Sequence, residues 1–122
     1  LKGYLLNKAT VLGKHYIVEY TGCTKDVLNK VEDIKPLFLK AAEESKATIL
    51  KSDFHQFEPA GVTGYIFIAE SHFSIHTWPE HNYVAFDILT CGDMEPEKAI
   101  NFLTEGLGAK KTDINIIERG FN

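Results

Sequence analysis

Cysteine, basic residues and long apolar runs are all scarce in this sequence. The two cysteines, Cys23 and Cys91, lie far apart and form no Cys-x-x-Cys pair, so we expect no structural zinc site. Lysine and arginine number 13 against 17 acidic residues, and the resulting formal net charge of −4 argues against a nucleic-acid partner. No apolar stretch approaches the length that spans a bilayer, so we expect no membrane association.

No secretory signal is visible at the start of the sequence, which leaves the cytoplasm as the expected compartment. In that compartment both cysteines are expected to stay reduced. A chain of 122 residues with 44% apolar content is large enough for one hydrophobic core, so we predict a single domain over residues 1–122.

The first half of the chain predicts one strand followed by a broken helix. Residues 15–20 are rich in β-branched and aromatic side chains and read as a strand, whereas residues 1–12 show no firm pattern and form either an arm or an added strand. Residues 26–45 have helical spacing. Pro36 disfavours one continuous helix, so we predict two pieces, with Asp33 capping the second and Pro36 in its first turn.

The second half predicts four strands, a helix and a last strand. The strands cover residues 47–57, 62–70, 72–77 and 83–90, with turns between them; a helix opens at residues 95–97, and residues 111–118 form the last strand. Tight links favour antiparallel pairing, and two helices can cover only one face of such a sheet. The order β-α-β-β-β-β-α-β therefore predicts an α/β (α+β) two-layer sandwich, mainly antiparallel, with the helices on one face.

The reactive side chains gather between two apolar strands. Glu70-Ser71-His72 follows one predicted strand, His76-Thr77-Trp78-Pro79-Glu80 comes directly after it, and Thr90-Cys91-Gly92 ends the next strand. Strand ends on a rigid sheet are common positions for catalytic groups. Together with Phe54-His55-Gln56-Phe57, the glycines at 61 and 64, and Gly13-Lys14-His15, these motifs resemble the prokaryotic S-adenosylmethionine decarboxylases, from about Gly13 to the end of the chain.

The resemblance implies a proenzyme that cuts its own backbone between Glu70 and Ser71, into residues 1–70 (beta chain) and 71–122 (alpha chain). Ser71 would attack the carbonyl of Glu70, and elimination and hydrolysis would leave a pyruvoyl group at position 71. His76 is the implied processing base, and imidazole suits that task near neutral pH. Thr63 supplies the processing hydroxyl at a position where the family usually has serine. His72 and His55 are weaker candidates that would hold the turn.

The resemblance also assigns the catalytic and substrate-binding residues. Cys91 is the implied proton donor after carbon dioxide leaves. Phe57 and Trp78 would hold an adenine ring or a sulfonium cation, and Glu80 would accept the ribose hydroxyls. Ordinary structural readings stay open for each: Cys91 as a small buried hydrophobe, the two aromatic residues as core, and His76 as a partly buried strand residue.

The implied reaction is decarboxylation of S-adenosylmethionine through a Schiff base with the pyruvoyl group, which yields the aminopropyl donor for spermidine synthesis. The sequence has no glycine-rich phosphate loop, no lysine in a pyridoxal context and no metal cluster, so we expect neither pyridoxal phosphate nor a metal. One alternative is a pyruvoyl-dependent decarboxylase of arginine or ornithine, and another is a non-catalytic binding subunit. A homodimer is expected, since two helices leave the other face of the sheet uncovered.

Overall fold

The computed structural model describes residues 10–122 of the chain, so the prediction for residues 1–9 lies outside the described part. Residues 10–12, for which an added strand was one expectation, are strand. The elements are β1 (Thr10–Thr21), α2 (Lys25–Leu28), α3 (Val31–Glu44), β2 (Ile49–Gln56), β3 (Val62–Ile68), β4 (Ser71–Trp78), the 3₁₀ turn η1 (Pro79–His81), β5 (Tyr83–Thr90), α4 (Pro96–Gly106) and β6 (Lys111–Phe121).

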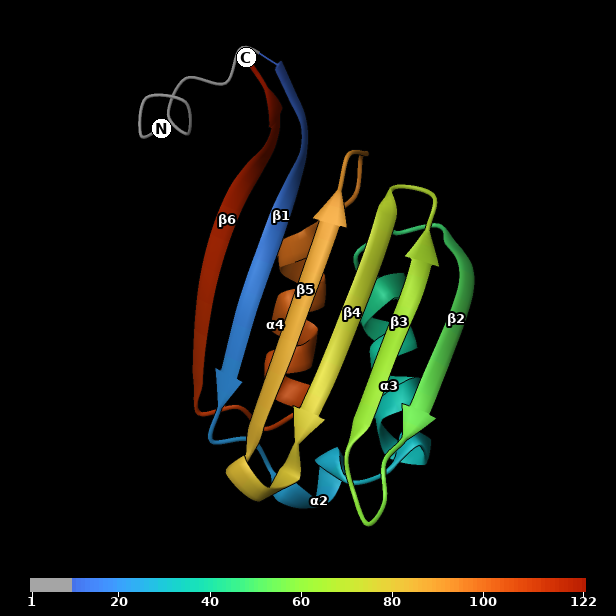
Figure 1. Ribbon diagram of the computed structural model, residues 1–122, viewed down its shortest axis with the longest axis vertical. Coiled ribbons are helices and arrows are strands. Elements are labelled where there is room, and N and C mark those ends of the chain that lie inside the picture. The colour runs from blue at the N-terminus through green and yellow to red at the C-terminus, as the bar shows by residue number, and fades with distance from the viewer. Residues whose placement is uncertain (1–9) are drawn as a thin grey trace.

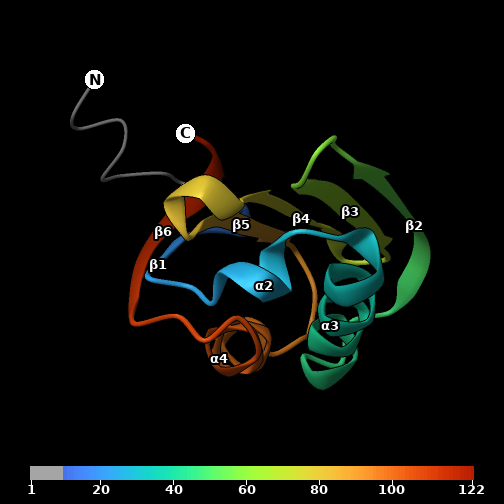
Figure 2. The same ribbon diagram turned by 90° about the horizontal axis from the view of Figure 1, so that it is seen from below.

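The six strands form one sheet in the order β2-β3-β4-β5-β1-β6 (Figure 1). Every neighbouring pair is antiparallel. The helices α3 and α4 lie against one face of this sheet, and no α-helix of residues 10–122 lies on the opposite face (Figure 2). The predicted two-layer α+β fold is therefore confirmed. We call the helix-free side the open face.

Alternation along the strands sends apolar side chains to the helix layer. Val84, Phe86 and Ile88 of β5 are buried, and their β1 partners across the sheet include Val18 and Tyr16. Phe38 of α3 packs edge-on against the ring of Phe86, with centroids 5.7 Å apart. Aromatic contacts of this kind add to the area that both rings bury. The alternate residues of β1 and β5 are half-buried or exposed and lie on the open face.

The cap predicted for the second helix is wrong. Helix α3 begins at Val31 rather than near Asp33, and its N-cap residue Lys30 makes no side-chain cap. A distant side chain satisfies the free backbone group instead, because Gln56 of β2 accepts a hydrogen bond from the Val31 N–H at 2.8 Å. Pro36 consequently lies beyond the first turn of α3, with its ring exposed.

The strand predicted over residues 72–77 is one residue longer at each end, and two other predicted strands were too short by several residues. Strand β1 begins at Thr10 rather than His15, and β6 continues to Phe121 rather than ending at Glu118. These two strands pair along their whole length, from Thr10 opposite Phe121 to Thr21 opposite Lys111. Mutual pairing explains the extension, since each strand supplies the backbone partners of the other. Within residues 10–122, no helix is long and apolar enough to cross a membrane.

Candidate active site

The junction between β3 and β4 holds Ser71 in an unusual backbone conformation. The two strands are joined by Ala69 and Glu70, and Ser71 is the first residue of β4, with φ = 145°. Glycine populates this region, whereas a residue with a Cβ pays about 1–3 kcal/mol to occupy it. Residues strained to this degree persist only where their surroundings hold them, so the contacts of the Glu70–Ser71 junction are informative.

Glu70 is anchored on both its side chain and its backbone. Its carboxylate accepts hydrogen bonds from the backbone N–H of Thr48 at 3.1 Å and from the Thr48 hydroxyl at 3.2 Å. Its carbonyl oxygen accepts the backbone N–H of Cys91 at 2.9 Å. Gly92 is necessary next to it, because a Cβ there would lie 2.5 Å from Glu70 Cγ. Glu70 is thus held by the residue before β2 and by the residue after β5.

Cys91 brings its thiol to the same peptide bond. The sulfur lies 3.4 Å from the Glu70 carbonyl oxygen and 3.9 Å from the Ser71 hydroxyl oxygen. Cys91 is exposed, so the reading of this residue as a buried hydrophobe is wrong. Cys23 is the buried cysteine of the chain, and burial raises the pKa of its thiol to about 11. The sequence did not reveal that the backbone N–H of Cys91 faces the Glu70 carbonyl, although Cys91 directly follows β5, the strand that pairs with β4.

A second cluster lies at the other end of β4. Thr63 and His76 are direct cross-strand partners, and the Thr63 hydroxyl is 3.1 Å from His76 Nδ1. Beside them is a cavity of about 270 Å³, and its lining consists of Phe57, Ala60, Gly61, Thr63, His76, Thr77, Trp78 and Glu80. Two residues expected to process the chain and three expected to bind substrate therefore lie together at this cavity. They are Thr63, His76, Phe57, Trp78 and Glu80.

The aromatic residues of this cavity are not core residues. Phe57 is 47% exposed and Trp78 is 40% exposed, which rules out the interpretation that both simply fill the interior. Each has an aromatic neighbour: the His55 ring lies edge-on to Phe57, with centroids 4.6 Å apart, and Tyr83 lies 5.4 Å from Trp78. Tyr83 was not singled out from the sequence. Its hydroxyl donates to Glu19, and burial, followed by this carboxylate, raises its pKa to about 12.

The two clusters are separated by the length of β4. Ser71 begins the strand and Trp78 ends it, so the β3–β4 link lies at the top of Figure 1 and the end of β4 at the bottom. His76 follows Ser71 by five positions, and a strand rises about 3.3 Å per residue, which separates the two residues by roughly 16 Å. Within one chain, the expected processing base is therefore out of reach of the serine that it would serve.

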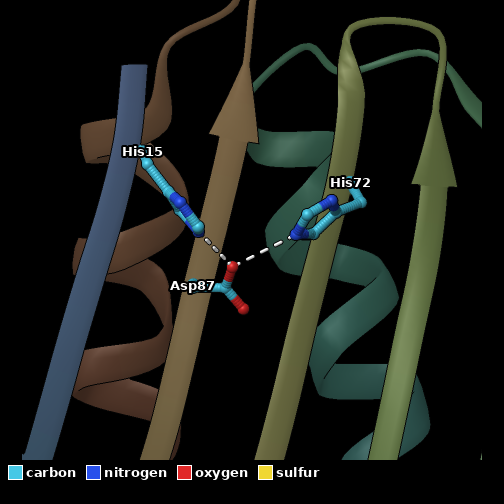
Figure 3. A group of neighbouring side chains, drawn as sticks. All are labelled: His15, His72 and Asp87. Atoms are coloured by element: carbon cyan, nitrogen blue, oxygen red, sulfur yellow. Dashed lines mark hydrogen bonds and ion pairs between the residues drawn. The ribbon is translucent and has the colours of Figure 1, made fainter. Parts of the chain in front are cut away.

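His72 points onto the open face and away from the junction. Its Nε2 lies 3.1 Å from the carboxylate of Asp87, which His15 also contacts at 2.6 Å (Figure 3). Burial raises the pKa of Asp87, but hydrogen bonds from Ser74, His15 and His72 outweigh it and hold that pKa below its usual range. The carboxylate is therefore ionised near neutral pH, and it keeps the His72 ring in place.

Comparison with known proteins gives a consistent result. Residues 14–120 match the family model described as S-adenosylmethionine decarboxylase. A relative from Thermotoga petrophila, named S-adenosylmethionine decarboxylase proenzyme, is 47% identical over 110 residues, which cover 89% of this chain and 85% of the relative. One of the same name from Thermococcus gammatolerans is 40% identical over 116 residues, covering 94% of this chain and 81% of the relative.

A solved structure agrees with these sequence matches. The crystal structure of the adenosylmethionine decarboxylase from Aquifex aeolicus superposes with a TM-score of 0.86 at 37% sequence identity, covering 93% of this chain and 95% of that one. The matched region contains the strained junction, the Cys91 contacts and the aromatic cavity. The chain belongs to the S-adenosylmethionine decarboxylase family.

Proposed function

We propose that this protein decarboxylates S-adenosylmethionine after cutting its own backbone between Glu70 and Ser71, into residues 1–70 and 71–122. The observation that carries the proposal is the junction itself: a strained serine whose preceding carbonyl accepts the Cys91 N–H at 2.9 Å. The names of the relatives favour S-adenosylmethionine over arginine or ornithine as the substrate. A cytoplasmic location stays a prediction, and a reducing compartment suits the two free thiols.

The first step of the proposed cut is an acyl shift. The Ser71 hydroxyl oxygen attacks the Glu70 carbonyl carbon and gives up its proton, the C–N bond breaks, and the nitrogen of residue 71 takes a proton. The product is an ester that joins the same two residues. Negative charge develops on the Glu70 oxygen during the attack, and the Cys91 N–H already points at that atom. A preorganised backbone donor of this kind stabilises the transition state without any rearrangement.

The second step is an elimination. A base removes the proton from Cα of residue 71, the bond between Cβ of that residue and the ester oxygen breaks, and Glu70 departs as the new C-terminal carboxylate. Water then replaces the nitrogen at residue 71, ammonia leaves, and a pyruvoyl group remains on the downstream chain. The site fits this group, because the Cys91 thiol lies beside position 71. Once formed, the pyruvoyl group supplies a keto carbon that accepts electrons from the breaking bond to the carboxylate.

The base for the elimination is proposed to come from a second copy of the chain. His76 is held by Thr63 at 3.1 Å but lies at the far end of β4 from Ser71. Two copies that stack their open faces about a two-fold axis, with strands running in opposite directions, bring the Ser71 end of one against the His76 end of the other. The same rotation forms two equivalent sites. The proposed homodimer therefore completes the site as well as covering the sheet.

The cavity next to His76 is the proposed nucleoside site. Phe57 and Trp78 offer two exposed aromatic faces for an adenine ring or a sulfonium cation, and the Glu80 carboxylate can accept the ribose hydroxyls. Its volume of about 270 Å³ is close to the lower limit of about 300 Å³ for ligand pockets, which suits part of the substrate rather than all of it. The remaining methionine portion would then extend toward position 71 of the facing copy.

Cys91→Ala is expected to be cut but to turn over slowly. The substitution keeps the backbone N–H that faces the Glu70 carbonyl, whereas it removes the thiol that donates a proton after decarboxylation. Loss of a general acid costs about 10²–10⁴-fold in rate. Carbon dioxide release from the cut variant measures the effect, and Cys23→Ala, which removes the buried thiol, is the control. A cut Cys91→Ala protein with parental turnover would disprove the proton-donor role.

Phe57→Ala and Trp78→Ala are expected to weaken S-adenosylmethionine binding without preventing the cut. Stacking of a base on an aromatic ring contributes about 1–3 kcal/mol in nucleic-acid complexes, which corresponds to roughly 5- to 150-fold in affinity. Calorimetric titration measures the change, and Phe121→Ala, which removes another exposed ring, on β6, serves as the control. Equal affinity in all three variants would remove the cavity from substrate binding.

A further inference from the structure

A chain of side-chain hydrogen bonds crosses four strands of the open face (Figure 3 shows its three central members). Arg119 of β6 donates to His15 Nδ1 at 2.9 Å, and His15 Nε2 lies 2.6 Å from Asp87 Oδ2. His72 Nε2 reaches the same oxygen at 3.1 Å, while the Ser74 hydroxyl donates to the other carboxylate oxygen. We call these five residues the Asp87 network.

The partners fix which atoms donate in this network. Arginine has only donors, so His15 Nδ1 accepts, and the proton of that ring is on Nε2, where it points at Asp87. His15 and His72 also offer nitrogens at metal-binding distances from Asp87. A metal at His15 Nε2 would, however, displace this proton and leave Nδ1 facing an arginine, whereas metal-bound histidines usually donate from the second nitrogen to an acceptor. The geometry therefore favours a hydrogen-bonded anchor over a ligand set.

One member of the Asp87 network, His72, directly follows the proposed cut site in the sequence. His72 becomes the second residue of the downstream chain, and strand β4 acquires a free end at position 71. New chain ends fray unless they are tied down. Glu70, with its contacts to Thr48 and Cys91, then ends the upstream chain and no longer holds residue 71 covalently, and the hydroxyl of Ser71 is lost in the reaction. The bond from His72 to Asp87 is the side-chain contact nearest the new end that survives the cut.

From this placement we infer that His72 is a positioning residue: its hydrogen bond to Asp87 of β5 pins the new N-terminus and holds residue 71 beside Cys91. The inference rests on the proposed cut. It assigns His72 no part in breaking the bond, because its ring is directed at Asp87 and not at the junction. Gln can donate from a similar reach and so replaces the anchor, whereas Ala cannot.

Hydrogen exchange of the backbone amides of residues 72–75 tests this role. In the cut protein, His72→Ala is expected to exchange these amides about 10-fold faster than the parent, because a hydrogen bond to a charged group is lost at a fraying end. His72→Gln is expected to restore protection, and Asp87→Ala, which removes the acceptor, to lose it as His72→Ala does. In the uncut Ser71→Ala background, where the strand end is covalently held, His72→Ala is expected to change exchange at these amides little.

Several results would overturn the inference. Equal protection in cut parent and cut His72→Ala protein would show that the bond anchors nothing. An equal loss in the uncut background would make the bond an ordinary contribution to the sheet, and an uncut His72→Ala chain would mean that His72 acts in the cut itself. Each of these leaves the proposed function standing. A parent chain that is never cut, by contrast, contradicts the proposed function and this inference together.

Discussion

Replacing Ser71 by alanine is expected to leave the chain full-length on a denaturing gel, while the parent separates into two chains. The variant lacks the oxygen that attacks the Glu70 carbonyl, and the side chain beside that oxygen, the Cys91 thiol at 3.9 Å, is proposed to act only after decarboxylation. Decarboxylase activity is expected to vanish with the cut, because the electron-accepting group forms only from Ser71.

Ser71→Gly is the matched variant for the strain at this position. Both substitutions remove the nucleophile, but only glycine adopts φ = 145° without strain. Glycine in a strand normally costs about 0.5–1 kcal/mol relative to alanine. Here we expect the opposite order, with the uncut glycine variant melting at the higher temperature. An alanine variant that is cut as fast as the parent would reject Ser71 as the nucleophile, and a less stable glycine variant would reject the strain.

The second large effect is expected from His76→Ala, which should stall after the acyl shift. The ester can form, since the Cys91 N–H still faces the Glu70 carbonyl, but no base removes the proton from Cα of residue 71. Hydroxylamine cleaves esters and leaves amides intact, so it is expected to divide this variant into two chains while it leaves Ser71→Ala whole. A His76→Ala protein that is cut at the parental rate would exclude this residue as the base.

Coexpression of Ser71→Ala with His76→Ala tests whether the base acts across the dimer. In a heterodimer, the Ser71→Ala chain keeps its own His76 and presents it to the intact Ser71 of the His76→Ala chain. Random pairing of equal amounts makes about half of the dimers mixed, so about half of the His76→Ala chains are expected to be cut. If base and serine acted within one chain, coexpression would yield no cut chain at all.

Much of this architecture could be predicted from the sequence, because the alternation of strands and the spacing of apolar residues in helices are both clear. Alternation in β5 puts Val84, Phe86 and Ile88 on one face, which the structure buries, and the resemblance that is most specific around residues 70–80 identified the family. The start of α3 could not be predicted, because Gln56, distant in sequence, accepts the first free N–H of that helix. Local signals such as Asp33 carry no information about a partner that only the folded sheet brings close.

The distance between Ser71 and His76 was missed for a different reason. Their spacing in sequence made them look like neighbours, although five residues of extended strand span roughly 16 Å. The elements around them were predicted correctly, and the rise of a strand would have given the separation. In the proposed homodimer the two residues meet across the two-fold axis, and the spacing within one chain gives no signal of such a contact.

Intact mass spectrometry of the purified parent protein tests the central claim most directly. We predict two chains, one ending at Glu70 and one beginning at position 71 with a pyruvoyl group in place of serine, together with the loss of both signals in Ser71→Ala. Light scattering of the same sample is expected to give the mass of two cut protomers. A single chain of unchanged mass, containing an intact serine at position 71 and still releasing carbon dioxide from S-adenosylmethionine, would contradict the account.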